Sequence, residues 1–135
     1  MTPDAEQSLS RARADLDDAR KIATLPIARF AARAAYSAAF HAAEAYIVAR
    51  TGKIAKTHSG VRSEFNRLIK DEVGDSRELR RVLKDGYHFK EMADYWTDSE
   101  KSISDQDAAA MIAAAQHFID RISALLSTSH PGANG

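Results

Sequence analysis

The sequence predicts an all-α fold, an up-and-down helical bundle of four long helices plus one short helix. Apolar residues recur with helical periodicity in five stretches, and no stretch shows the alternation typical of a β-strand. Residues that begin or end helices flank most of these stretches. A length of 135 residues suits one domain, and the absence of cysteine excludes disulfides and thiolate metal sites.

The first two expected helices cover residues 4–23 and 26–50. The first has an apolar face formed by Leu9, Ala12, Leu16, Ala19 and Ala23. Pro26 suits the first turn of the second helix, which Thr51 and Gly52 end. The many alanines of the second helix permit close approach of neighbouring helices, and its aromatic residues supply bulk.

Three further helices follow a loop over residues 52–58. Thr57 or Ser59 caps the short third helix, which Gly74 ends. Asp75 and Glu78 have the spacing of a capping box for a fourth helix that reaches about Tyr95. Residues 97–104 form a loop before the last helix, over 105–126. We therefore expect one domain over residues 1–126 and a disordered tail over 127–135.

Neither a secretory signal nor a membrane span is expected. The first ten residues, MTPDAEQSLS, contain no apolar segment. The longest apolar stretch, residues 31–49, is mostly alanine and is interrupted by Arg33, His41 and Glu44. These features predict a cytoplasmic protein.

A net charge of zero conceals a gradient along the chain. Residues 50–90 contain 11 Lys or Arg and 6 Asp or Glu, whereas residues 91–110 contain 6 acids and only Lys101. This pattern has two interpretations. One is a basic surface that meets nucleic acid phosphates, and the other is a set of solvated helix faces whose charges pair within the bundle.

Three segments resemble the HEPN family of small prokaryotic helical proteins, in particular its UPF0332 branch. They are YSAAFHAAEA (residues 36–45), THSGVRSEF (57–65) and ADY (93–95). Their order and spacing are similar to those of the family, and the resemblance covers residues 10–126. It implies a helical bundle that commonly dimerises. It also implies a metal-independent ribonuclease toxin, often accompanied by a small nucleotidyltransferase that serves as antitoxin.

Active members of the family carry an arginine followed by a histidine after four to six residues. Arg81 and His88 have this spacing, and seven residues place both on one helix face. Histidine can exchange protons near neutral pH, and a guanidinium can hold a phosphate bidentately. The sequence departs from the family pattern at Val82 and Lys90. Alternatively, the family's histidine position aligns with Ala93, which would make the protein catalytically silent.

A nucleotide or RNA site is a second hypothesis from the residues around the third helix. His58 and Ser59 begin a helix whose free amides can bind an anion, and Lys56 and Arg62 lie nearby in the sequence. Capping of the helix alone is the competing interpretation. Lys90 belongs to the same basic segment, and Tyr87, Tyr95 and Trp96 are the aromatic residues that could stack on bases.

Two histidine–carboxylate pairs suggest a metal site as a weaker alternative. They are His41 with Glu44 and His117 with Asp120, each three residues apart. The di-iron pattern of helical bundles needs glutamate before histidine, so we expect no metal and no cofactor. The leading hypothesis is a HEPN component of a bacterial toxin–antitoxin or defence module with RNA cleavage as its candidate activity. It would be a homodimer partnered by a nucleotidyltransferase. The alternative is a non-catalytic interaction or nucleotide-binding subunit.

Overall fold

Five helices account for the described part of the chain, as the apolar periodicity predicts. This computed structural model describes residues 1–95 and 102–128. The helices are α1 (Pro3–Ile22), α2 (Ala28–Thr51), α3 (His58–Ile69), α4 (Ser76–Asp94) and α5 (Asp105–Thr128). No strand occurs among these residues, so the predicted all-α class is confirmed. None of the described helices is both long enough and apolar enough to cross a membrane.

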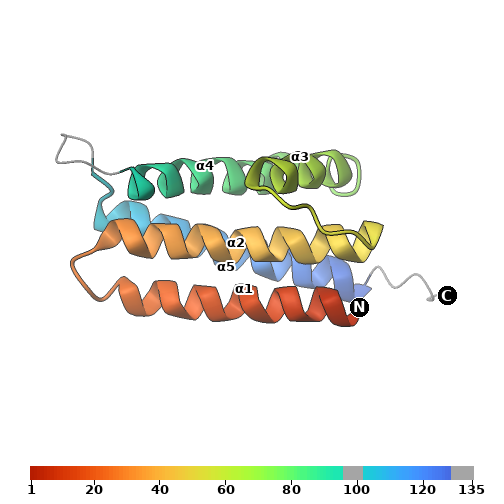
Figure 1. Cartoon of the computed structure of the whole chain (residues 1–135), viewed down its shortest axis with the longest axis horizontal. Coiled ribbons are helices and arrows are strands. Elements are labelled where there is room, and N and C mark those ends of the chain that lie inside the picture. Colours follow the sequence, from red (N-terminus) through yellow and green to blue (C-terminus); the bar gives the residue numbers. More distant parts are fainter. Residues whose placement is uncertain (96–101, 129–135) are drawn as a thin grey trace.

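Helix α2 is the central element of the bundle. It contacts all four other helices, with α1 on one side and the α3–α4 pair on another (Figure 1). This position follows from its composition, because its buried alanines let neighbouring helices approach closely on several sides. Its two buried tyrosines fill the remaining space. Tyr46 contacts Phe65 of α3 with ring centroids 5.3 Å apart, and Phe65 contacts Phe118 of α5 at 5.2 Å.

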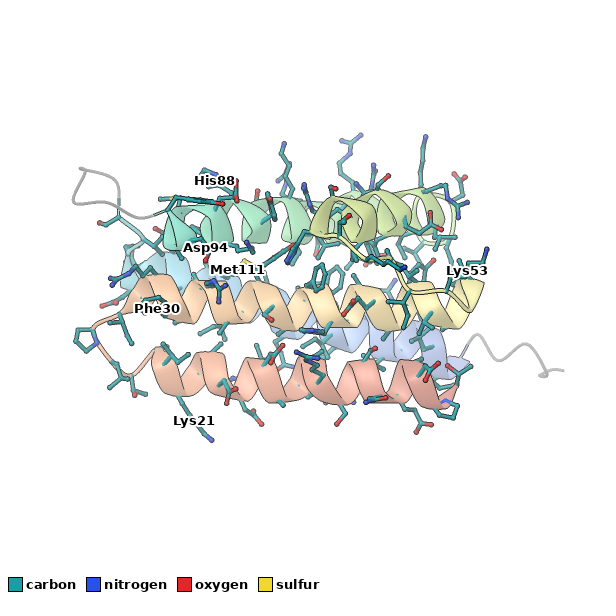
Figure 2. The ribbon with its side chains drawn as sticks, viewed as in Figure 1. Lys21, Phe30, Lys53, His88, Asp94 and Met111 are labelled. Carbon is teal, nitrogen blue, oxygen red and sulfur yellow. The ribbon has the colours of Figure 1, made fainter. Side chains whose placement is uncertain are left out.

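Gly86 lets α4 approach both α2 and α5. A Cβ atom at this position would lie 2.6 Å from Cδ1 of Tyr36 and 3.0 Å from Cε of Met111. Real Cβ atoms do not approach other carbons that closely, so no residue with a side chain fits without displacing the neighbours. Met111 projects into the space between α4 and α2 (Figure 2). Gly86 therefore fixes the distance between the helices that carry the site described below.

The predicted start of the second helix was wrong by two residues. Helix α2 begins at Ala28 rather than at Pro26. The N–H of Ile27 donates to the carbonyl of Leu25 at 2.8 Å, which closes a tight turn with Pro26 at its centre. The fixed φ of proline suits this turn as well as it suits a helical first turn.

The predicted capping box at the start of α4 was also wrong. Asp75 is the N-cap but makes no side-chain cap bond. Its carboxylate instead accepts two hydrogen bonds from Arg121 of α5, both 2.8 Å long, and Glu78 lies 3.1 Å from His117. The guanidinium of Arg121 makes two charge-assisted hydrogen bonds in a fixed bidentate geometry, whereas a cap would make one, so the carboxylate binds Arg121.

The other helix ends agree with the sequence patterns to within a residue or two. Thr57 rather than Ser59 caps α3, since its hydroxyl accepts from the N–H of Gly60 at 2.9 Å. Ser127 and Thr128 belong to α5. The expected disorder of 129–135 and most of the expected loop over 97–104 concern residues outside the described ones.

Candidate functional site

A groove of about 800 Å³ lies between α4 and α5. We call it the α4/α5 groove. Arg81 and His88 both line it and are both exposed, so the structure brings the predicted pair to one open surface. Figure 2 shows His88 on the outer side of α4. The groove also has an apolar lining, which is formed by Val82, Phe89, Ala110, Met111, Ala113 and Ala114.

The guanidinium of Arg81 forms no ion pair with the acids on its own helix. Asp85 and Glu78 are its neighbours along α4, but Glu78 pairs with His117 and Asp85 makes no ion pair within residues 1–95 and 102–128. His88 also has no acidic partner in this part of the chain, and its nearest ring neighbour is Phe89 at 6.3 Å. Both side chains are therefore available to a ligand.

A second groove, of about 580 Å³, lies between α3 and α4. We call it the α3/α4 groove. Its cationic side chains are those of Arg62, Arg77, Arg80, Arg81 and Lys84, whereas Asp85 is its single acid. None of the five cations forms an ion pair with the described acids. Part of the basic excess of residues 50–90 is therefore gathered in this groove, whereas Arg50, Arg67 and Lys90 of the same segment pair with acids.

A third, smaller hollow of about 210 Å³ opens beside His58, where α2, α3 and α4 meet. We call it the His58 hollow. The hydroxyl of Tyr36 and Nδ1 of His58 share a hydrogen bond of 3.1 Å, and the imidazole lies 4.4 Å from the ring of Phe40. Burial, together with the positive charges of Lys90 and Arg62, lowers the pKa of His58. A neutral imidazole that accepts at Nδ1 carries its proton on Nε2.

The carboxylate of Asp94 and the ring of Tyr87 hold the cationic side chains near this hollow in place. Asp94 accepts from Arg33 Nε at 2.5 Å and from Lys90 Nζ at 2.6 Å. The hydrogen bond from Lys90 is the main reason that the pKa of Asp94 is lowered. The guanidinium of Arg62 lies 4.1 Å above the ring of Tyr87. Figure 2 shows Asp94 on the side of α4 that faces α2.

The three segments that carry the family resemblance therefore converge in space. Tyr36 comes from the first segment, His58 and Arg62 come from the second, and Asp94 comes from the third. The family model described as "HEPN domain" matches residues 5–125. The chain belongs to the HEPN family. This match names the family and not a branch within it. No protein among those with curated functions is similar enough to count as a match.

The structure brings together only some of the residues predicted to bind RNA or a nucleotide. His58 and Lys90 line the His58 hollow, and Arg62 lies close enough to lower the pKa of His58 but lines the α3/α4 groove instead. Lys56 is exposed in the loop before α3, and Ser59 is exposed in the first turn of that helix. Tyr95 lies at the end of α4 with 74% of its surface exposed. Trp96 lies outside the described residues.

Sequence reasoning missed several residues of this HEPN chain that line its grooves. Arg33 and Tyr36 at the His58 hollow come from α2. No local pattern connects Tyr36 to His58 or Arg33 to Asp94, because these partners are distant in the sequence. A signal for the α3/α4 groove was present in the sequence. Arg77, Arg80, Arg81 and Lys84 stand at positions i, i+3, i+4 and i+7, which a helix places on one face.

The two histidine–carboxylate pairs have structural partners. Nδ1 of His41 lies 2.8 Å from both Asp15 Oδ2 and the carbonyl of Ser37, whereas Glu44 is 3.7 Å from Nε2. The other histidine, on α5, contacts Glu78 rather than its own helix's Asp120. Among residues 1–95 and 102–128, no group of three or more His, Asp or Glu side chains could hold a metal ion.

Proposed function

We propose that this HEPN protein is the RNA-cleaving component of a cytoplasmic toxin–antitoxin or defence module, and that Arg81 and His88 carry its chemistry. The observation that supports the proposal is that both side chains are exposed in one groove and lack an acidic partner. A functional pair has to be free to meet substrate, whereas a structural pair would be buried or neutralised.

The proposed reaction is a transphosphorylation that needs no metal. His88 takes the proton from a ribose 2′-hydroxyl, and the resulting oxygen attacks the adjacent phosphorus. The bond from phosphorus to the 5′ oxygen breaks, and that oxygen receives a proton. The products are a 2′,3′-cyclic phosphate and a 5′-hydroxyl. Arg81 donates to the phosphate oxygens and offsets the charge that develops on them.

A second copy of the chain supplies the acid that protonates the leaving oxygen. In the proposed homodimer, two α4/α5 grooves face each other, so that each scissile phosphate meets a histidine from both copies. The apolar lining of the groove, with the half-buried Phe89 and the exposed Ala110 and Ala113, suits such a contact. Helix α2 offers less, because Tyr36 and Tyr46 are buried inside the chain and Phe30 is its one large exposed apolar side chain among the described residues.

Cleavage of a labelled oligoribonucleotide tests the proposal. We expect His88→Ala and Arg81→Ala each to lower the rate at least about a hundredfold, the usual effect of removing a general base. A chelator should have no effect. His117→Gln is the matched control, because His117 lines the same groove from α5 but has no role in the proposed reaction, and the amide of glutamine can still donate to Glu78. Unchanged cleavage by the His88 variant, or loss of cleavage with the chelator, would contradict the assignment.

The second candidate function is a non-catalytic, nucleotide-binding subunit that partners a nucleotidyltransferase. The convergence of the three family segments on the His58 hollow favours it, since cations and aromatic rings surround a small opening there. Calorimetry with ATP distinguishes the two functions. Binding that is lost in His58→Ala but kept in Arg81→Ala, in a protein that cleaves no RNA, would support the subunit.

A further inference from the structure

The cations of the α3/α4 groove are arranged against the usual rules of helix stability. Arg77 with Arg81 and Arg80 with Lys84 are four residues apart, and like charges at this spacing repel each other. Arg77 also lies in the first turn of α4, where the helix dipole disfavours positive charge. Arg62 packs over the ring of Tyr87 and Arg80 donates to the carbonyl of Ser76, but none of the five positive charges is neutralised by a described acid, so the groove suits a ligand that is negatively charged.

Two polar atoms of the same groove lack hydrogen-bond partners. Nε of Arg62 and Oδ1 of Asn66 are buried among the described residues without a partner, and both side chains line the groove. Unpaired buried polar atoms are unfavourable unless a ligand or water completes them. One of these atoms is a donor and the other is an acceptor. An acceptor is needed beside Nε of Arg62 and a donor beside Oδ1 of Asn66, and RNA, like water, offers both.

We propose that the α3/α4 groove binds the sugar–phosphate backbone of single-stranded RNA and delivers it to Arg81, an assignment that rests on the proposed cleavage of RNA. Arg62, Arg77, Arg80 and Lys84 contact phosphates, and the 2′-hydroxyl donates to Oδ1 of Asn66. In RNA every nucleotide places a hydroxyl donor beside its phosphate, whereas the acidic side chains of a protein segment carry acceptors alone and its donors lie on the backbone. Arg81 lines both grooves, so a strand that lies along the first reaches the proposed catalytic pair.

Binding to catalytically inactive protein tests this assignment directly. In a His88→Ala background, we compare the triple variant Arg77→Gln/Arg80→Gln/Lys84→Gln with the triple variant Lys21→Gln/Lys53→Gln/Lys70→Gln. The control removes the same charge from exposed sites away from the groove; Figure 2 shows Lys21 and Lys53 there. The slope of log affinity against log salt should fall by about 2 in the groove variant, since each single-strand phosphate contact contributes roughly 0.7.

An equal loss in both triple variants would overturn the assignment, because binding would then follow net charge alone. Asn66→Leu gives a second measure. The protein should prefer an RNA oligonucleotide to DNA of the same sequence, and Asn66→Leu should remove that preference. If poly-glutamate binds more tightly than RNA at equal ionic strength, the groove is a protein-docking surface and the RNA assignment is wrong.

The outcome is separable from that of the proposed catalysis. If RNA binds through the groove but the wild-type protein cleaves none, the backbone-binding site is supported. The catalytic roles proposed for Arg81 and His88 are then wrong. If the wild type cleaves RNA, and the same three substitutions made with His88 intact leave both binding and cleavage unchanged, the catalytic proposal is supported and the backbone site is refuted.

Discussion

The basic side chains of α4 are paired with an acid near its C-terminus and unpaired with the described acids in its N-terminal half. Near its C-terminus, Lys90 shares the carboxylate of Asp94 with Arg33 of α2, so the charges tie two helices together. In its N-terminal half, Arg77 and Arg81 face solvent and the α3/α4 groove with no acid to pair with among the described residues. The difference shows that the fold neutralises the charges it uses. The unneutralised charges on the same helix are those that the proposed RNA site would use.

The largest effect is expected where α4 meets α2, at Gly86. Gly86→Ala should lower the free energy of unfolding by about 1–3 kcal/mol, the usual cost of overpacking. The added Cβ would lie 2.6 Å from Cδ1 of Tyr36, whose ring is buried and cannot move away. Urea unfolding followed by circular dichroism measures the change. Gly74→Ala is the control, because a Cβ there meets nothing within 4 Å. A Gly86→Ala protein as stable as the control would show that α4 is free to shift.

A smaller effect is expected from Asp94→Asn. Loss of two ion pairs should cost about 1 kcal/mol at pH 7, since exposed pairs contribute roughly 0.2–1 kcal/mol each. The pKa of Asp94 is lowered in the folded state, so its contribution is present above the unfolded value of about 3.9 and is lost as pH falls through the folded pKa. The stabilities of wild type and variant should therefore converge in acid. Asp71→Asn is the control, because it removes an exposed carboxylate with no ion pair among the described residues. Its difference in stability from the wild type should change less with pH than that of Asp94→Asn.

The smallest effect should have the opposite sign. Arg77→Gln removes a positive charge that is repelled by Arg81 and disfavoured at the start of a helix. The change should therefore stabilise the fold by roughly 0.2–0.5 kcal/mol. The same change should weaken RNA binding. Thermal unfolding and an RNA titration on one preparation measure both. A variant that loses stability would mean that Arg77 supports the fold, and the contrast between the two ends of α4 would disappear.

Most of the fold could be predicted from the sequence because helical periodicity and capping are local. The apolar face of α1 and the cap at Thr57 depend only on residues within a turn or two of each other. Asp75 shows where such reasoning fails. Its spacing from Glu78 predicts a capping box, but Arg121 lies 46 residues away and competes for the same carboxylate. No local pattern contains that competitor.

The candidate site was predictable to a similar degree. The seven-residue spacing places Arg81 and His88 on one face of α4, and the structure agrees. The fold also gathers His58, Tyr36 and Arg33 from two helices around one hollow, and this depends on how α2 and α3 cross. Sequence reasoning grouped His58 with Lys56 and Ser59 because they are adjacent in the chain. In space, Lys56 and Ser59 do not line that hollow.

Three residues of α4, namely Arg81, Lys84 and Asp85, line both large grooves. An occupant of one groove changes the position or the charge environment of these side chains, and so changes the free energy of binding in the other. Thermodynamic linkage then requires reciprocity. If a molecule in the α4/α5 groove alters the affinity of the α3/α4 groove by some factor, the second ligand alters the affinity of the first by the same factor.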